Sequence, residues 1–218
     1  MTTHLAVQLA DTELWLLPDK AIWWPQQGML LIADIHFGKA ATYRLLGQPV
    51  PEGTTARDLQ RLDRLLECYP SRQLVFLGDF LHAAKGRTTA LLDTLNAWRE
   101  RHPALEITLI RGNHDRRAGD PPESLGIHVR AEPWAIGPFA LQHEPEKHPT
   151  QHVLAGHVHP AYRLTGRGRQ QLRLPCFCLG ERVSLLPAFG SFTGAMTLEK
   201  RPGQRIFVVG GNQVWAVE

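Results

Sequence analysis

The stretch Ile107-Thr108-Leu109-Ile110-Arg111-Gly112-Asn113-His114-Asp115 joins an apolar run to a polar turn. The apolar part has the composition of a buried β-strand. The polar part places an amide, an imidazole and a carboxylate next to one another, as a turn that presents side chains to a ligand would do. Asn and Asp also favour turns for local reasons, because their side chains bond to their own backbone. Alone, the stretch fits either a functional turn or an ordinary polar loop.

Four further polar clusters follow short apolar runs elsewhere in the chain. They are Asp34-Ile35-His36, Gly78-Asp79-Phe80-Leu81-His82, His143 after residues 139–142, and Gly156-His157-Val158-His159. Open α/β sheets gather their ligand sites at the ends of strands, so we expect the five clusters to converge. Imidazole, carboxylate and amide groups without thiolate suit transition metals of intermediate hardness. The pattern therefore predicts a metal centre.

The first half of the chain alternates expected strands and helices. We predict strands over residues 29–33, 73–77 and 107–110, a short helix over 38–46, and longer helices from Thr54 to Pro70, capped by Thr54 or Thr55, and from Thr88 to Arg101. The charged residues of the helix after Thr54 are interpreted as a solvated face; they are Arg57, Asp58, Arg61, Asp63 and Arg64. Alternation of this kind indicates a parallel sheet with helices on its faces, and hence an α/β fold.

The second half of the chain is predicted to be mostly β. We expect short strands over residues 127–131, 138–142, 152–155, 161–165, 170–174, 181–186 and 205–217, and a first hairpin over 5–9 and 13–17. Gly166-Arg167-Gly168 and Gly210-Gly211-Asn212 are expected to form hairpin turns. So many strands indicate two packed sheets.

Composition fits one globular domain over residues 1–218, since 43% of the residues are hydrophobic and 21% are charged. No apolar run approaches the length of a membrane span, and the first residues do not resemble a signal peptide, so we expect a cytoplasmic protein with no membrane partner. Cys68, Cys176 and Cys178 have no disulfide spacing. Cys176 and Cys178 share one face of a strand, and we favour two small buried residues over a metal role.

The five clusters, in their order along residues 29–160, resemble the motifs of the calcineurin-like metallophosphoesterases. Within this family, Ala33-Asp34-Ile35-His36-Phe37-Gly38-Lys39 and Gly156-His157-Val158-His159-Pro160 are similar to the ligase-associated DNA damage response phosphoesterases of the PdeM type. The resemblance implies a four-layer α/β/β/α sandwich, in which two mixed sheets are flanked by helices.

The resemblance also implies a role for each polar residue of the clusters. Asp34, His36 and His159 would hold a first divalent metal ion, Asn113, His143 and His157 a second, and Asp79 would bridge the two. The mixed oxygen and nitrogen ligands and the family favour manganese, with iron or zinc as alternatives. Two such ions can clamp the attacking and the leaving oxygen of a phosphoryl displacement.

His114 is implied to be catalytic, as the group that faces the phosphate and protonates the leaving oxygen. The family often has Asp where His82 stands, and that Asp orients the catalytic imidazole. We assign His82 a catalytic role, either as the partner of His114 or as a separate substrate contact, with a structural role as the alternative.

Basic residues near the clusters are candidate substrate contacts. Arg163, Arg167, Arg169 and Arg173 lie in a stretch without acidic residues just after His159, where a hairpin could follow a phosphate backbone. Arg111, Arg116, Arg117 and Lys39 are candidate phosphate contacts. For each set the alternative is an ordinary solvated surface.

The resemblance implies a phosphodiesterase that acts as an endonuclease on single-stranded DNA in repair, with DNA as its partner and with a DNA ligase and a helicase in the same pathway. A small-molecule phosphoesterase, acting on nucleotides or lipid-linked phosphates, is the alternative enzyme, since fold and site do not choose a substrate. A binding subunit of a repair complex is a third hypothesis, against which the complete ligand set argues.

Overall fold

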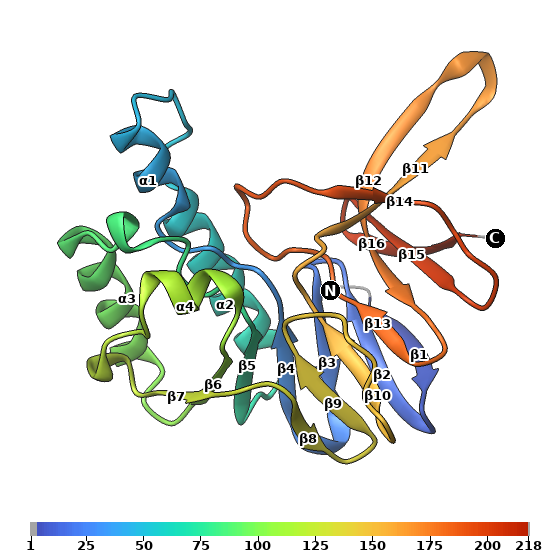
Figure 1. Cartoon of the computed structure of the whole chain (residues 1–218), viewed down its shortest axis with the longest axis horizontal. Helices are drawn as coiled ribbons and strands as arrows, with labels where there is room; N and C mark the ends of the chain where they lie inside the picture. Colours follow the sequence, from blue (N-terminus) through green and yellow to red (C-terminus); the bar gives the residue numbers. More distant parts are fainter. Residues whose placement is uncertain (1–3, 218) are drawn as a thin grey trace.

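Two mixed β-sheets stack face to face in the computed structural model, which describes residues 4–217 apart from the side chain of Arg169 (Figure 1). The first sheet has the order β1-β2-β3-β4-β5-β6-β7. Its strands are β1 (Leu5–Leu9), β2 (Thr12–Leu17), β3 (Ala21–Trp24), β4 (Met29–Ile32), β5 (Gln73–Leu77), β6 (Glu106–Ile110) and β7 (Ile127–Arg130). Strands β1 to β4 are antiparallel and β4 to β7 are parallel. The carboxyl ends of β4, β5 and β6 therefore meet at one edge.

Helices connect the parallel strands of the first sheet. They are α1 (Lys39–Leu45), α2 (Thr54–Cys68), α3 (Thr89–Arg101) and α4 (Asn113–Ala118), with short 3-10 turns η1 (Pro25–Gln27), η2 (Ala84–Gly86), η3 (Glu123–Leu125) and η4 (Arg167–Arg169). Leu59, Leu62 and Leu65 of α2 are buried against the sheet, as their spacing predicts. The predicted threonine cap of α2 is wrong, because Gly53 precedes the first turn and makes no side-chain bond.

The second sheet has the order β14-β11-β12-β13-β10-β9-β8, with β15 beside β12 and β16 beside β15. Its strands are β8 (Trp134–Ile136), β9 (Phe139–Gln142), β10 (His152–Ala155), β11 (Pro160–Thr165), β12 (Gln171–Leu179), β13 (Val183–Leu185), β14 (Met196–Leu198), β15 (Arg205–Gly210) and β16 (Gln213–Val217). Strands β9, β10 and β13 are parallel. The carboxyl ends of β9 and β10 thus form a second edge where side chains can gather.

The core between the sheets joins strands from both halves of the chain. Leu14, Trp24 and Leu31 of the first sheet pack in one cluster with Phe139 and Phe177 of the second. The rings of Trp24 and Phe139 meet edge to face, with centroids 5.1 Å apart. This shared core fixes the edge of one sheet against the edge of the other.

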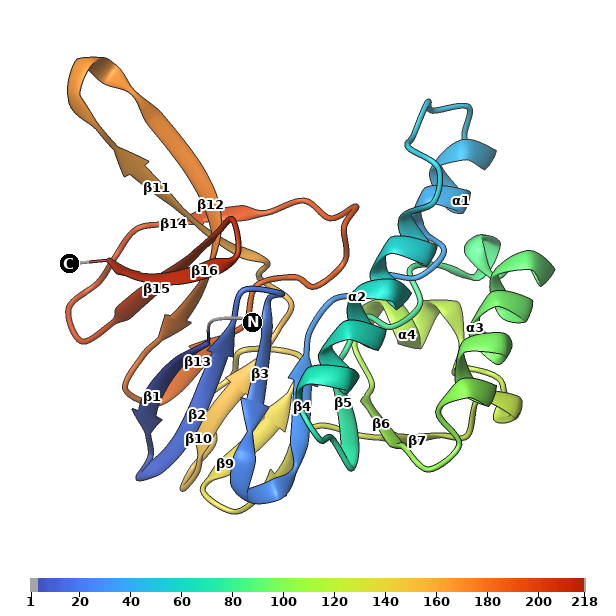
Figure 2. The same ribbon diagram turned by 180° about the vertical axis from the view of Figure 1, so that it is seen from behind.

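All four α-helices of residues 4–217 precede residue 119 and lie beside the first sheet (Figures 1 and 2). Two mixed sheets with flanking helices are thus confirmed. Over the described part of the chain, however, no α-helix covers the outer face of the second sheet, where the resemblance implies a fourth layer. That face is closed by strand residues, among them the buried Cys176, Cys178, Ile206 and Val208. Both thiols are buried, which confirms their structural interpretation.

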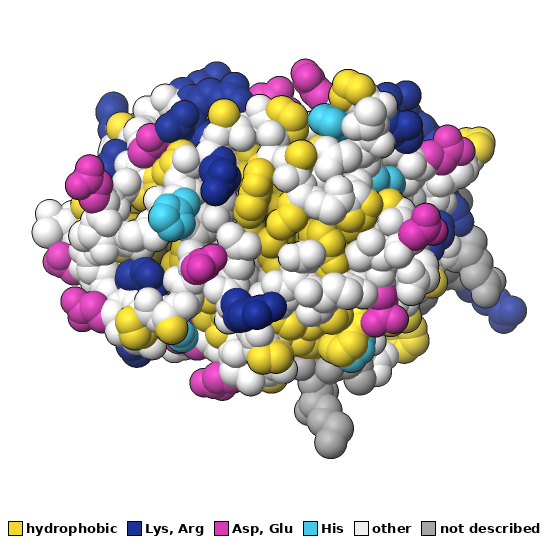
Figure 3. Space-filling view, turned by 90° about the horizontal axis from the view of Figure 1, so that it is seen from below, with side chains coloured by type: hydrophobic (Ala, Val, Ile, Leu, Met, Phe, Trp, Pro, Cys, Tyr) yellow, Lys and Arg dark blue, Asp and Glu magenta, His cyan; other side chains and the backbone are white. Residues whose placement is uncertain are grey.

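Two arms project beyond the sheets at one end of the molecule, and residues 187–195 run between them (Figures 1 and 2). One arm is α1 with residues 46–53, and the other is the β11–β12 hairpin. At the opposite end of the molecule, seen from below in Figure 3, basic and acidic side chains are interspersed. None of the helices in residues 4–217 combines the length and the apolar character that crossing a membrane requires.

Candidate metal centre

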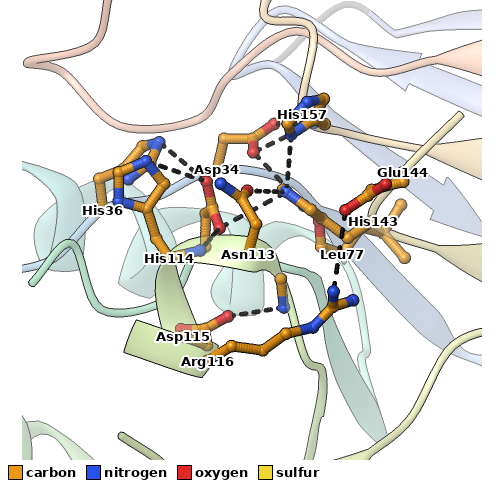
Figure 4. Close-up of polar contacts among 12 residues, drawn as sticks. Asp34, His36, Leu77, Asn113, His114, Asp115, Arg116, His143, Glu144 and His157 are labelled. Carbon is orange, nitrogen blue, oxygen red and sulfur yellow. Dashed lines mark hydrogen bonds and ion pairs between the residues drawn. The ribbon is translucent and has the colours of Figure 1, made fainter. Parts of the chain in front are cut away.

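All seven predicted metal ligands converge at the carboxyl ends of strands. Asp34 follows β4, Asp79 follows β5, and Asn113 follows β6 as the first residue of α4. His36 also follows β4. The other three ligands come from the second sheet, since His143 follows β9 and both His157 and His159 follow β10. Figure 4 shows side chains from both sheets pointing toward one another. The two edges together thus form a single polar cluster.

One group of ligands consists of Asp34, His36, Asp79 and His159. One ligand atom from each of the four side chains lies within 4.8 Å of the others. Nε2 of His36 is 3.3 Å from Nε2 of His159, and Nε2 of His159 is 3.5 Å from Oδ1 of Asp34. This group contains the three residues predicted for the first metal ion together with the predicted bridge.

A second group lies beside the first and consists of Asn113, His143 and His157. Nε2 of His143 is 2.9 Å from Oδ1 of Asn113 and 3.0 Å from Nδ1 of His157. These are the three residues predicted for the second metal ion. Ligand atoms that share a metal ion at about 2.0–2.2 Å lie roughly 3 Å from one another, so the spacing of this group fits a shared cation.

Asp79 lies between the two groups. Its Oδ2 is 3.5 Å from Nε2 of His36, and its Oδ1 is 3.5 Å from Nε2 of His143. Asp34 and Asp79 are both almost completely buried, and burial raises the pKa of Asp79 above its ordinary value. Within residues 4–217, the side chains that pair with these two carboxylates within 4.0 Å are histidines. Bound cations would supply the positive charge that these buried carboxylates otherwise lack.

Backbone carbonyls orient the imidazoles of the two groups. Nδ1 of His143 bonds to the carbonyl of Leu77 across 3.1 Å, and Nδ1 of His159 bonds to the carbonyl of Gly194 across 3.1 Å. Each bond leaves Nε2 directed into the cluster. Metal-binding histidines are commonly held in this way by the nitrogen that does not bind the metal. The imidazoles are thus prearranged for a metal.

Five of the ligands have a backbone conformation that L residues rarely adopt. The φ angles are +54° for Asp34, +53° for His36, +52° for Asp79, +66° for His157 and +51° for His159. Such strain costs about 1–3 kcal/mol per residue and persists where the surrounding structure enforces it. At these turns it directs each side chain back into the cluster.

Two glycines of the motifs leave room that the ligands occupy. A Cβ atom on Gly78 would lie 2.1 Å from Nδ1 of His143, and one on Gly156 would lie 2.6 Å from Oδ2 of Asp34. Gly78 also has a φ of +80°, which only glycine adopts freely. The glycine before Asp79 and the glycine before His157 are therefore required by close packing.

Acidic residues behind the ligands tie their loops together. The buried Asp115 accepts the backbone N–H groups of Leu81 and Gly112, which belong to two of the motifs. Glu132 accepts the N–H of His143 across 2.8 Å and pairs with Arg116 across 2.6 Å. Asp115 thus holds the loop after Asp79 and the loop before Asn113 together. Glu132 was not predicted, because it lies outside every motif.

His114 is positioned beside the two groups without belonging to them. Its Nδ1 donates to the backbone carbonyl of His82 across 2.7 Å, and its backbone N–H donates to Oδ1 of Asp79. Its Nε2 is left to face the cluster, 4.0 Å from Oδ2 of Asp79. The imidazole of His82 stacks on that of His114, with centroids 4.7 Å apart. His82 therefore orients His114 through its carbonyl and its ring.

Burial controls the charge of the histidines around Asp79. It lowers the pKa of His82 to about 4, with the nearby His114 and Lys39 adding to the effect. Burial also lowers the pKa of His36. Burial alone would lower the pKa of His159 too, but its bonds to Asp34 and the Gly194 carbonyl raise it above its ordinary value. Neutral His36 and His82 can donate a nitrogen lone pair to a cation.

The predicted substrate arginines fall into two sets. Arg111 makes a bidentate salt bridge with Asp120, in which Nε is 2.9 Å from Oδ1 and Nη2 is 2.6 Å from Oδ2. Arg116 pairs with Glu132. Both guanidinium groups thus have carboxylate partners within the chain. Their assignment to the substrate stays a prediction.

The second set lies on the β11–β12 hairpin. Arg163 and Arg173 are directly opposite each other on one face, while Leu164 and Leu172 occupy the other face. Arg173 donates to the carbonyl of Ala195, next to the residue that orients His159. The arginine face is therefore the one beside residues 187–195. Arg167 is exposed at the tip, and the side chain of Arg169 lies outside the described residues.

Residues 187–195 were not predicted to take part in the site. They cover α2, where the buried Asp58 accepts the N–H of Ser191 and Arg61 lies over the ring of Phe189 at 3.8 Å. The predicted solvated face of α2 is therefore wrong for Asp58 and Arg61. Residues 187–195 belong to no motif and lie far along the chain from α2, so the sequence carries no signal for this packing.

Comparisons with known proteins identify a family and similar structures. The family model for calcineurin-like phosphoesterases matches residues 29–144, more than half of the chain. A crystal structure of Pseudomonas putida nuclease MPE is similar, with 50% identity, a TM-score of 0.88, and coverage of 99% of this chain and 100% of that one. Yfce, a phosphoesterase from E. coli, is 15% identical with a TM-score of 0.38, covering 82% of this chain and 86% of its own.

A search of curated protein sequences found no match. The family match contains the first five ligands, from Asp34 to His143. The fold brings the other two, His157 and His159, to the same centre. This chain belongs to the calcineurin-like phosphoesterase family.

Proposed function

We propose that this protein is a manganese-dependent phosphodiesterase that cuts single-stranded DNA internally. The observation that carries the proposal is the position of Asp79, whose two oxygens face two separate groups of ligands. When bound there, two divalent cations supply positive charge that polarises a phosphodiester and lowers the pKa of an attacking water. The complete set of side chains argues for an enzyme over a binding subunit.

The chain itself supplies the proton for the leaving group. His114 is fixed by the His82 carbonyl through Nδ1, and its side chain is about one-third exposed, at 31%. Its Nε2 can therefore reach a phosphate held at the ligand cluster and protonate the departing oxygen. General acid catalysis of this kind contributes typically about 10²–10⁴-fold.

The choice of DNA as substrate has two supports. The Pseudomonas putida protein that matches at 50% identity over 99% of this chain is described as a nuclease. The β11–β12 hairpin adds an exposed arginine face on the side of residues 187–195, which also orient His159. A basic face beside the ligand cluster favours a polyanion over a small phosphate ester.

Manganese is the metal that the donor set favours. Asp34, Asp79 and Asn113 offer oxygen ligands, and four imidazoles complete the cluster. Carboxylates suit manganese and imidazoles suit iron and zinc as well, so the mixture fits manganese with iron and zinc as competitors. On the basis of the family resemblance, we further propose that the protein acts in DNA repair in the cytoplasm, in a pathway that includes a DNA ligase and a helicase.

Metal and substrate class are tested together with metal-stripped protein. Manganese, iron(II) or zinc is restored separately, and hydrolysis of linear single-stranded DNA, duplex DNA, a small diester and a small monoester is compared. We expect manganese to restore the highest activity and single-stranded DNA to be the best substrate. A strong preference for the monoester would overturn the DNA assignment and select a small-molecule phosphoesterase.

A further inference from the structure

A continuous series of rings leads outward from the ligand cluster. The centroids of His36 and His114 are 4.9 Å apart, and His114 stacks on His82 at 4.7 Å. The series continues from His82 to Tyr43 at 6.1 Å and from Tyr43 to Phe192 at 5.6 Å. The first three rings belong to the site already described. Tyr43 and Phe192 have no part in binding metal or in moving a proton.

Tyr43 and Phe192 come from different parts of the chain, α1 and residues 187–195, and meet edge to face at an angle of 87°. Each ring limits the rotation of the other. Each is only partly buried, so part of each ring surface stays open to a ligand. The pair adjoins His82, which stacks on His114. An open pair of rings in this position is suited to stack a planar group.

The segment that carries Phe192 is held firmly. Asp58 accepts the N–H of Ser191 at 3.0 and 3.2 Å, and the side chain of Arg61 donates to the carbonyl of Phe189. The side chain of Thr193 also bonds to the carbonyl of Gly190 across 3.1 Å. A ring held in this way loses little conformational entropy when a ligand binds.

A cation stands next to the ring pair. Nζ of Lys39 lies 6.0 Å from the centroid of the Phe192 ring. Its charge also interacts with the carboxylates of Asp34 and Asp79, so it lies near the ligand cluster as well as near the Phe192 ring. A nucleotide has a planar base and an anionic phosphate, and the rings and Lys39 offer a complementary surface for each.

We propose that Tyr43 and Phe192 stack the base of the nucleotide next to the scissile phosphate. The inference rests on the proposed nuclease function and deepens it. In a duplex, each base is already stacked and paired, so its faces are not free for the two rings. An unpaired base can turn onto them without that cost. The ring pair thus gives the enzyme its preference for single strands.

The test compares two strands with identical backbones. One is an oligodeoxythymidylate, and in the other a central run of tetrahydrofuran residues replaces the bases. Phe192→Ala and Tyr43→Ala are expected to lower kcat/KM on the thymidylate strand by about tenfold, because base stacking on an aromatic side chain is worth about this much or more. Neither change is expected to affect cleavage within the tetrahydrofuran run. Tyr43→Phe keeps the ring and is expected to retain wild-type values.

Trp215→Ala is the matched control, since Trp215 is an aromatic residue 56% exposed on β16, outside the ring series. It is expected to leave kcat/KM on both strands unchanged. An equal decrease in kcat/KM on both strands for Phe192→Ala would overturn the proposal and indicate that Phe192 has a structural role. No loss on either strand would overturn it as well.

Binding separates this inference from the nuclease assignment. Affinities of both strands are measured by fluorescence anisotropy on the His114→Ala background in calcium, which limits cleavage. If Phe192→Ala weakens binding of the thymidylate strand alone, stacking is supported. This holds even if the wild-type protein cuts no DNA, since absence of cleavage would reject only the proposed nuclease function. Unchanged binding of both strands would reject stacking, even where wild-type protein cuts DNA.

Discussion

Nδ1 of His114 donates a hydrogen bond to the backbone carbonyl of His82 across 2.7 Å. The carbonyl holds the imidazole by a hydrogen bond, and the ring of His82 adds a stacking contact. In the family, an Asp often stands at this position and orients the catalytic imidazole. Here a main-chain group fulfils that role, which explains how His82 can replace the carboxylate.

His114→Ala is therefore expected to lower kcat on DNA by about 10²–10⁴-fold, the usual contribution of a general acid. His82→Ala keeps the carbonyl and loses only the stacked ring, so its loss is expected to be clearly smaller. Steady-state kinetics on single-stranded DNA measure both. On a diester with a p-nitrophenolate leaving group, which needs no proton, His114→Ala is expected to lose less. Equal losses for the two variants on DNA would contradict this account of His82.

Asp79→Ala is expected to remove the bridge between the two ligand groups and to abolish stoichiometric manganese binding. Metal analysis after equilibrium dialysis should give two manganese ions per wild-type chain and fewer than one for the variant. Asp93→Ala, at an exposed position on α3, is the control and should retain two. Full binding by Asp79→Ala would show that the two groups do not share this carboxylate.

Gly78→Ala is expected to lower both thermal stability and manganese affinity, because the added Cβ would lie 2.1 Å from Nδ1 of His143. Gly47→Ala is the matched control, since Gly47 has a similar φ of +74° and nothing within 4 Å of the added carbon. The backbone strain alone costs about 1–2 kcal/mol in either variant. Thermal denaturation with and without manganese separates the two effects. Equal behaviour of the variants would contradict the packing argument.

The hairpin arginines should affect DNA more than small substrates. Arg163→Ala combined with Arg167→Ala is expected to reduce cleavage of single-stranded DNA, to weaken its dependence on salt, and to leave cleavage of a small diester nearly unchanged. Arg72→Ala is the control, because Arg72 is exposed and precedes β5 at the end opposite the ligand cluster. Equal losses on DNA and on the small diester would count against the hairpin as a DNA contact.

Lys20 makes stability depend on pH. It is partly buried next to Asp19, Asp58 and Arg61. Loss of solvent around the ammonium group lowers its pKa from 10.5 to about 7. Between these two values the unfolded state binds more protons than the folded state, so the contribution of Lys20 to stability rises with pH. The unfolding free energy of wild type relative to Lys20→Met should therefore increase by up to about 1.4 kcal/mol per pH unit in that window.

Urea denaturation at several pH values measures this difference. Lys147→Met, a change at an exposed lysine, should give a difference that does not vary with pH. A constant difference for Lys20→Met as well would show that Lys20 keeps an ordinary pKa in the folded protein.

Local patterns predicted the strands and the ligand cluster well. The strands over 73–77 and 152–155 coincide with β5 and β10, because continuous apolar runs bounded by glycine or polar residues leave few alternatives. Parallel strands put their carboxyl ends at one edge, so Asp34, Asp79 and Asn113 had to approach one another. The structure confirms their proximity.

Other features depend on packing between distant segments. Asn113 was expected in a turn, but it is the first residue of the short helix α4. Strands β8 and β14 have three residues each, which is too short for an alternation of apolar and polar residues to be recognised. Asp58 was assigned to solvent because only residues 187–195, far along the chain, bury it. The contact between Tyr43 and Phe192 also depends on the packing of residues 187–195 against a distant segment, and neither residue belongs to a motif.

Cleavage of a closed circle of single-stranded DNA by metal-stripped protein with manganese restored tests the central claim most directly, since a circle without ends can be cut only internally. The account predicts that wild-type protein linearises and then fragments the circle, and that His114→Ala does so at least about 10²-fold more slowly. A circle that stays intact while the same preparation hydrolyses small phosphate esters would contradict the assignment as a DNA endonuclease.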